Sequence, residues 1–144
     1  MATYQKHQDY AEQLNKAVHN WSTHTFKAVF CNTAPVATNS VLADLTQIST
    51  AGGYTAGAGG GVTLDTVTLS ETTGTAKVTI ADEVFTASGA SVGPLRYVDI
   101  YNDTPTSPAD PLVCFFDYGS SITLLDTESL TIDFDPTNGL WQLV

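Results

Sequence analysis

The chain has 144 residues and a mass of 15.3 kDa, which suits a single domain with one hydrophobic core. Five basic residues face 15 acidic residues, for a net charge of −10. Binding to nucleic acid or to anionic lipid depends on Lys and Arg, so this balance argues against both classes of partner. Residues 1–20 lack the apolar stretch of a secretory signal, and no later stretch has the length of a membrane span. We therefore expect a protein made in the cytoplasm.

The N-terminal residues carry a semi-apolar stripe at helical spacing, which predicts a short amphipathic helix within residues 4–21. An extended arm is the alternative for residues 1–22. The stripe is too sparse to hold a helix by itself, so we expect the segment to need contacts with the domain or with a neighbouring subunit. Its members are Tyr4, His7, Ala11, Leu14, Val18 and Trp21.

From Thr23 the spacing changes to alternation, which predicts a strand that ends before Pro35. Residues 40–49 return to helical spacing and predict one or two helical turns. Residues 51–61 contain six glycines in eleven positions, which is typical of a mobile or tightly turned loop. This loop does not predict a phosphate site, because a strand follows it and no Lys-Ser or Lys-Thr pair ends it. We expect the loop to become ordered only against a partner.

The remainder of the chain has strand-length segments separated by turn residues. The predicted strands cover residues 62–69, 76–81, 83–87, 96–101, 112–118, 122–125, 130–134 and 139–144. The Asp-Pro-Thr-Asn-Gly sequence at residues 135–139 is a turn signal, and it predicts that the last two strands form a hairpin. Residues 23–144 are therefore expected to form an antiparallel β-sandwich or a barrel-like domain, so the fold class is mainly β.

Catalytic and metal-binding patterns are not evident in the sequence. His7, His19 and His24 have neither the spacing of a zinc site nor a recognisable nucleophile beside them, and we expect exposed or lightly packed histidines. Cys31 and Cys114 lie in apolar segments and are expected to be buried, reduced thiols. We predict a protein that is not an enzyme and has no cofactor.

Acidic and aromatic residues in the second half admit other interpretations. Paired carboxylates could cleave a glycosidic bond or hold calcium, but many of these acidic residues lie beside turn formers, and we expect the set to stabilise turns or to be solvated. The aromatic residues could form a platform for a sugar, although packing in the core or an interface is more economical. The candidate platform consists of Tyr97, Tyr101, Phe115, Phe116, Tyr118 and Trp141.

Several short blocks within residues 23–144 resemble, in their order and spacing, a family of small virion structural proteins of tailed bacteriophages. The blocks are Asn32-Thr33-Ala34-Pro35-Val36-Ala37, Gly53-Tyr54-Thr55-Ala56-Gly57, Thr86-Ala87-Ser88-Gly89, Gly93-Pro94-Leu95-Arg96-Tyr97, Tyr101-Asn102-Asp103-Thr104, Asp117-Tyr118-Gly119-Ser120-Ser121 and Phe134-Asp135-Pro136-Thr137-Asn138-Gly139. The resemblance implies a component of the virion. A capsid cement or decoration protein is the first choice, and a tail or baseplate component is the alternative.

This resemblance also sets expectations about partners. The chain would bind the major capsid protein or tail proteins and would form a homo-oligomer, with a trimer as one option. A carbohydrate-binding β-sandwich is the alternative from a different functional class. The candidate interface residues, in the N-terminal segment and the glycine-rich loop, are Tyr4, Leu14, Val18, Trp21 and Tyr54.

Overall fold

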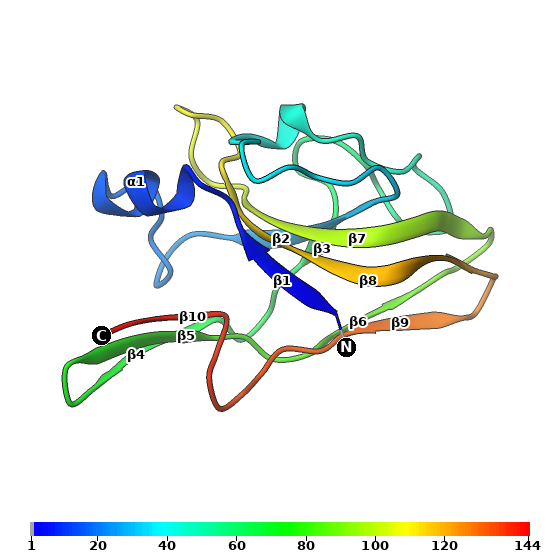
Figure 1. The fold of residues 1–144 in the computed structure, drawn as a ribbon. Helices are drawn as coiled ribbons and strands as arrows, with labels where there is room; N and C mark the ends of the chain where they lie inside the picture. Colours follow the sequence, from blue (N-terminus) through cyan, green and yellow to red (C-terminus); the bar gives the residue numbers. More distant parts are fainter. Residues whose placement is uncertain (1) are drawn as a thin grey trace.

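The computed structural model describes residues 2–144 and shows a mainly β protein whose strands pair antiparallel (Figure 1). Within these residues no helix has both the length and the apolar character needed to span a bilayer. The elements in chain order are β1 (Thr3–Lys6), α1 (Tyr10–Asn15), β2 (Phe26–Cys31), a 3₁₀ turn (Leu42–Asp44), β3 (Val62–Thr63), β4 (Thr68–Thr72), β5 (Thr75–Thr79), β6 (Glu83–Thr86), β7 (Val92–Asn102), β8 (Leu112–Leu124), β9 (Ser129–Ile132) and β10 (Trp141–Leu143).

The largest sheet has five strands in the order β1-β8-β7-β2-β3. Its centre is the long antiparallel pair β7 and β8, in which Val98 lies opposite Phe116. Strand β2 pairs with the other side of β7, and β1 pairs with the outer side of β8. Strand β1 therefore forms one edge of the large sheet.

A second layer faces this sheet and consists of two small sheets, β10-β5-β4 and β6-β9 (Figure 1). The main core lies between the layers, where Phe26, Phe30 and Ile100 of the large sheet belong to one buried cluster with Val78 and Ile132 of the second layer. Alternation explains this arrangement, because every second side chain of a strand points to the same face. The predicted mainly β, antiparallel, single-domain fold is confirmed.

The predicted C-terminal hairpin is wrong. The turn forms, since Asp135 accepts the N–H groups of Thr137 and Asn138 and Gly139 has a φ of 74°. However, β9 before the turn pairs with β6, whereas β10 after the turn pairs with β5. The turn connects the β6-β9 sheet to the β10-β5-β4 sheet. Strand β5 has a free edge with which β10 pairs, and the N–H of Leu140 donates to the carbonyl of Val78 next to this pairing.

A hairpin that the sequence analysis missed joins β4 and β5 through Thr73 and Gly74, which have φ values of 52° and 87°. The strand predicted at residues 62–69 is divided between β3 and the start of β4. The one or two helical turns predicted in residues 40–49 exist only as the 3₁₀ turn Leu42–Asp44.

The N-terminal helix is much shorter than predicted. Residues 3–6 form a strand that satisfies the open edge of β8, and helix α1 covers only Tyr10–Asn15 before Ala17 adopts a φ of 58°. An isolated helix of this length is unstable in water, so its packing against the domain decides where it ends. Buried Tyr10 and Trp21 join residues 2–22 to the main core, and this segment is not a separate arm.

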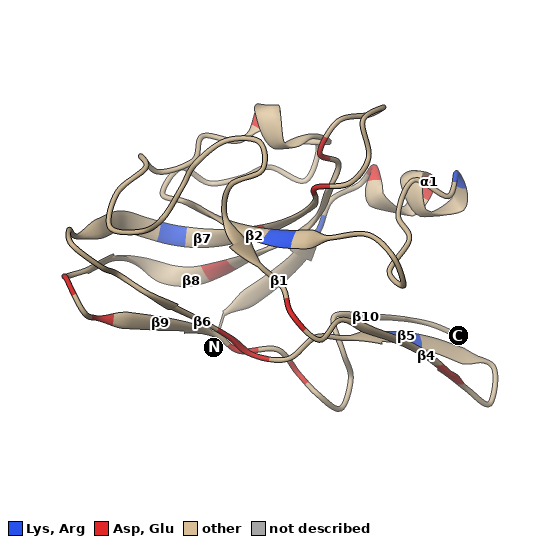
Figure 2. Cartoon of the chain, turned by 180° about the vertical axis from the view of Figure 1, so that it is seen from behind, with Lys and Arg blue, Asp and Glu red and all other residues tan. Residues whose placement is uncertain are grey.

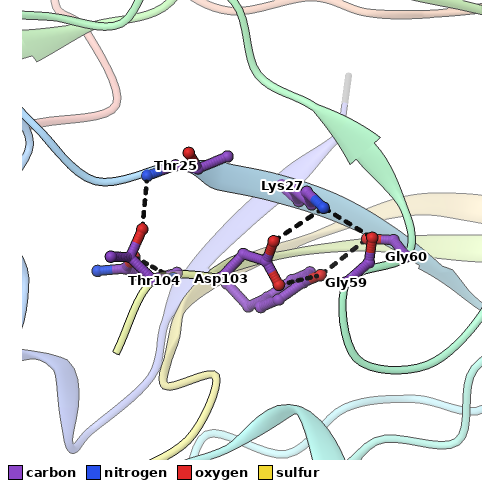
Figure 3. A network of polar contacts seen from close by, with 8 residues as sticks. Thr25, Lys27, Gly59, Gly60, Asp103 and Thr104 are labelled. Carbon is purple, nitrogen blue, oxygen red and sulfur yellow. Dashed lines mark hydrogen bonds and ion pairs between the residues drawn. The ribbon is translucent and has the colours of Figure 1, made fainter. Parts of the chain in front are cut away.

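The glycine-rich loop 51–61 is fixed within the protomer, contrary to our expectation. Lys27 on β2 donates to the carbonyl of Gly59 at 2.7 Å and pairs with Asp103 at 2.8 Å (Figure 3). The Tyr101 hydroxyl donates to the carbonyl of Gly60 at 2.8 Å. These contacts tie the loop to β2 and to the end of β7 without a partner chain.

Candidate functional site

An open groove of about 530 Å³ lies between the inner face of the large sheet and the chain that runs from β9 to β10. Side chains of β7 and β8 form its floor, β1 forms one wall, and residues 130–135 with 139–140 form the other. Most of the lining is apolar. The lining residues are Ala2, Tyr4, Leu95, Arg96, Val98, Phe116, Tyr118, Ile122, Leu130, Thr131, Ile132, Asp133, Phe134, Asp135, Gly139 and Leu140.

A row of aromatic rings crosses the groove from β1 to the opposite layer. The ring of Tyr4 meets the ring of Phe116 edge-on, with 5.5 Å between centroids, and Phe116 meets Phe134 at 6.2 Å. Tyr4 is opposite Phe116 in the ladder between β1 and β8, which brings both side chains to the inner face. Tyr4 is nevertheless 42% exposed, so its ring offers surface to a ligand. Partial burial raises the pKa of its hydroxyl, which remains a hydrogen-bond donor at neutral pH.

The charged residues that line the groove are mainly acidic. Among the described residues that line the groove, Arg96 is the only cation, and two hydrogen bonds of 2.7 and 2.9 Å join its guanidinium to Asp117. This pairing lowers the pKa of Asp117, so the two charges cancel. Asp133 and Asp135 on the opposite wall are exposed, and hydrogen bonds from Asn138 and Thr137 lower the pKa of Asp135. The wall formed by residues 133–135 is therefore negatively charged at neutral pH.

Strand β1 has an outer edge with free backbone groups. The N–H of His7 donates to the carbonyl of Val113 at 3.0 Å, so His7 and Val113 are a hydrogen-bonded pair of the antiparallel ladder. Such pairs recur at every second residue along the strand. Odd-numbered residues of β1 therefore bond β8, and the N–H and C=O groups of Tyr4 and Lys6 point away from the sheet. The next outward donor, the N–H of Gln8, binds the carbonyl of Ala37, so the open edge ends at Lys6.

The structure places the five predicted interface residues in different environments. Tyr4 lines the groove, while Leu14 and Val18 are half-buried. Trp21 is 3% exposed and stacks on Phe26 with 3.7 Å between ring centroids. Its Nε1 atom donates to the hydroxyl of Tyr10 at 2.9 Å. Trp21 is consequently a core residue of the protomer, and the prediction that its side chain contacts a partner is wrong.

Tyr54 is also a core residue, with 1% of its side chain exposed. Its hydroxyl accepts the N–H of Phe30 at 3.0 Å and lies 3.1 Å from Oε1 of Gln47, to which it donates. The ring stacks on Phe30. Tyr54 therefore anchors the glycine-rich loop to β2, and it offers no surface to a partner.

The expectation of exposed histidines is wrong for His7 and His19. His7 is fully buried and its Nε2 atom lies 2.9 Å from Oδ2 of Asp99. Nδ1 atoms of His19 and His24 both lie within 3.2 Å of the Asn102 side-chain nitrogen, which donates to them. Asp99 is one of the acidic residues of the second half, which as a set were expected to stabilise turns or to be solvated, but it is buried within β7. No local spacing could have revealed these contacts, since 92 residues separate His7 from Asp99.

The candidate sugar platform is largely absent from the surface. Tyr97, Tyr101 and Phe115 are buried, and Phe116 and Trp141 are half-buried. Tyr118, at 55% exposure, is the exposed member of the set. One exposed ring does not make the flat aromatic surface on which a sugar would stack.

Within residues 2–144 no three His, Cys, Asp or Glu side chains converge in a way that could hold a metal ion. Cys31 and Cys114 are free and buried, as predicted. Comparison with protein-family models, with curated proteins and with solved structures finds no match for this chain. The groove and the free edge of β1 are thus the surface features that best fit a binding role.

Proposed function

We propose that the chain is a non-enzymatic structural protein of a tailed-phage virion, first of all a capsid cement or decoration protein on the outer shell. The observation that carries the proposal is the apolar groove beside the free edge of β1, a surface suited to docking on another protein. The sequence resemblance over residues 23–144 supplies the virion context. The major capsid protein is the proposed partner.

The rest of the protomer agrees with such a role. Its glycine-rich loop and N-terminal segment are fixed by internal contacts, so docking would cost little ordering entropy in these two segments. Acidic residues are spread over both layers, while Lys and Arg are few (Figure 2). A net charge of −10 keeps free protomers soluble before they assemble and favours a basic partner surface.

The proposal also covers the location of the protein in the particle and its oligomeric state. A tail or baseplate component remains the alternative, because such a protein would use the same surface. A homo-oligomer, including a trimer, would need a second contact surface. The exposed apolar side chains of Leu69 on β4 and Leu143 on β10 are candidates for it.

Quantitative mass spectrometry of purified particles tests the proposal. A copy number similar to that of the major capsid protein would support a cement or decoration protein, and a much smaller number would support a tail component. Absence of the chain from purified particles would overturn both. Sedimentation of the purified protein would test the proposed oligomer.

Deletion of residues 1–20 is not a suitable test. This deletion would remove His7, the partner of buried Asp99, and Tyr10, the partner of Trp21, so it would disturb the core. Point substitutions on exposed atoms of β1 and of the groove are therefore required to separate binding from folding.

A further inference from the structure

We propose that the groove and the outer edge of β1 bind one extended segment of a partner protein, which carries apolar and basic side chains on its groove-facing side and adds to β1 as a further strand. The inference goes beyond the virion role, because it names the chemistry of the bound segment and holds whichever protein supplies it.

The backbone of β1 supplies the first part of the argument. Tyr4 and Lys6 direct their N–H and C=O groups outward, where they are ready to pair with an added strand. All four residues of β1 are exposed, so no segment of the described chain covers this edge. The contact of Gln8 with Ala37 closes the edge at one end and limits the added strand to the stretch beside residues 3–6.

The groove supplies the second part. A strand on the outer side of β1 would continue the large sheet over the open side of the groove, because Tyr4 lies on β1 and lines the groove. Every second side chain of that strand would point toward Tyr4, Phe116 and Leu130. Apolar side chains at those positions would bury surface that is open to solvent in the free protomer.

The charge of the groove indicates which side chains the bound segment carries. The wall opposite β1 carries the exposed carboxylates of Asp133 and Asp135, while the charge of Arg96 is cancelled by Asp117. Lys or Arg side chains on the groove-facing side of the bound segment would therefore meet negative charge that none of the described lining residues neutralises. A second copy of this chain is a poorer occupant, because two protomers of charge −10 repel each other and β1 carries a single basic residue.

The experiment uses the full-length protein and a fluorescent eight-residue peptide that has threonine at every second position. Valine and lysine occupy the positions between in turn, so that both lie on one face of the strand. Anisotropy should report saturable binding that weakens with salt. The same peptide with glutamate in place of lysine should not bind. A valine-lysine peptide with N-methylated backbone amides should bind at least about tenfold more weakly, because it cannot complete the ladder.

Two pairs of variants locate the site on the protein. Lys6→Pro removes an outward N–H without breaking a bond to β8, so it should weaken peptide binding at least about tenfold, whereas Lys6→Ala retains the N–H and should not. Asp133→Asn should weaken binding about threefold or more. The matched control is Asp65→Asn, since Asp65 is exposed and lies outside the groove lining, and it should bind like the wild type.

Four results would overturn the proposal. They are no binding of the valine-lysine peptide, equal binding of the glutamate peptide, unaltered binding of the N-methylated peptide, and concentration-dependent dimers that Lys6→Pro abolishes. The last result would assign the edge to a second copy. The N-methylated peptide tests the ladder even if Lys6→Pro fails to fold. Because these measurements use no particles, they are independent of the copy-number test of the virion role.

Discussion

The Nε2 atom of His7 lies 2.9 Å from the Oδ2 atom of Asp99, and both side chains are completely buried. His7 follows the edge strand β1, whereas Asp99 belongs to the central strand β7, so the pair fastens the N-terminal segment to the middle of the sheet. The ring of Phe115 covers the pair at 5.2 Å from the ring of His7. Burial raises the pKa of Asp99 to about 6, and the bond from His7 opposes that effect.

His7→Ala should lower the free energy of unfolding by about 3–5 kcal/mol, because it leaves the Asp99 carboxylate buried without its partner. Replacing His7 and Asp99 together with Leu should cost less than His7→Ala alone. Urea unfolding measures both. Glu12→Ala is the control, since it breaks the exposed ion pair with Lys16 and should have no measurable effect. A His7→Ala variant as stable as this control would contradict the prediction.

His19 should make stability depend on pH. Burial and the nearby His24 lower the pKa of His19 from 6.5 to about 4, so the folded protein holds a neutral ring. Stability contributed by His19 is complete above pH 6.5 and is lost as the pH falls toward 4, because the unfolded chain binds the proton first. The raised pKa of Asp99 acts in the opposite direction between pH 4 and 6.

The His19 effect is therefore isolated by comparison with His19→Phe. The stability of the wild type relative to this variant should increase by about 3 kcal/mol between pH 4 and 6.5. Urea unfolding at several pH values provides the measurement. A difference that stays constant with pH would show that His19 does not titrate in this way.

Gly52 and Gly53 offer a matched pair of substitutions in the glycine-rich loop. Both have positive φ values, 54° and 85°, but only at Gly52 would an added Cβ collide with the carbonyl of Ala90 and with Val92. Gly53→Ala should cost about 1 kcal/mol for its backbone conformation alone. Gly52→Ala should cost more than about 3 kcal/mol, since neighbouring backbone must also move. Equal thermal unfolding temperatures for the two variants would contradict this expectation.

Cys31 and Cys114 should be chemically quiet in the native protein. Burial raises the pKa of Cys31 to about 12 and raises the pKa of Cys114 as well. Neither side chain is exposed, so a thiol reagent should label both only after unfolding. Replacing both with Ala should cost roughly 0.5–3 kcal/mol. Rapid labelling in native buffer would show that a thiol is accessible.

The sequence by itself determined the fold class and part of the core. In β2 the apolar residues Phe26, Ala28 and Phe30 lie on one face of the strand. This alternation predicts a strand with one buried face, and the prediction does not depend on which strand pairs with β2. The apolar surroundings of Cys31 and Cys114 likewise predicted their burial. Such features depend on neighbours along the chain, and they can be read without knowing the fold.

Only the tertiary structure decided which strands pair and which polar groups meet. The turn at residues 135–139 was recognisable, but competition between the free edges of β5 and β9 settled where β10 pairs. The helical spacing in residues 4–21 was overridden because the open edge of β8 could satisfy the backbone of residues 3–6. The His7–Asp99 pair and the groove beside β1 join segments that are distant along the chain, so no local pattern encodes them.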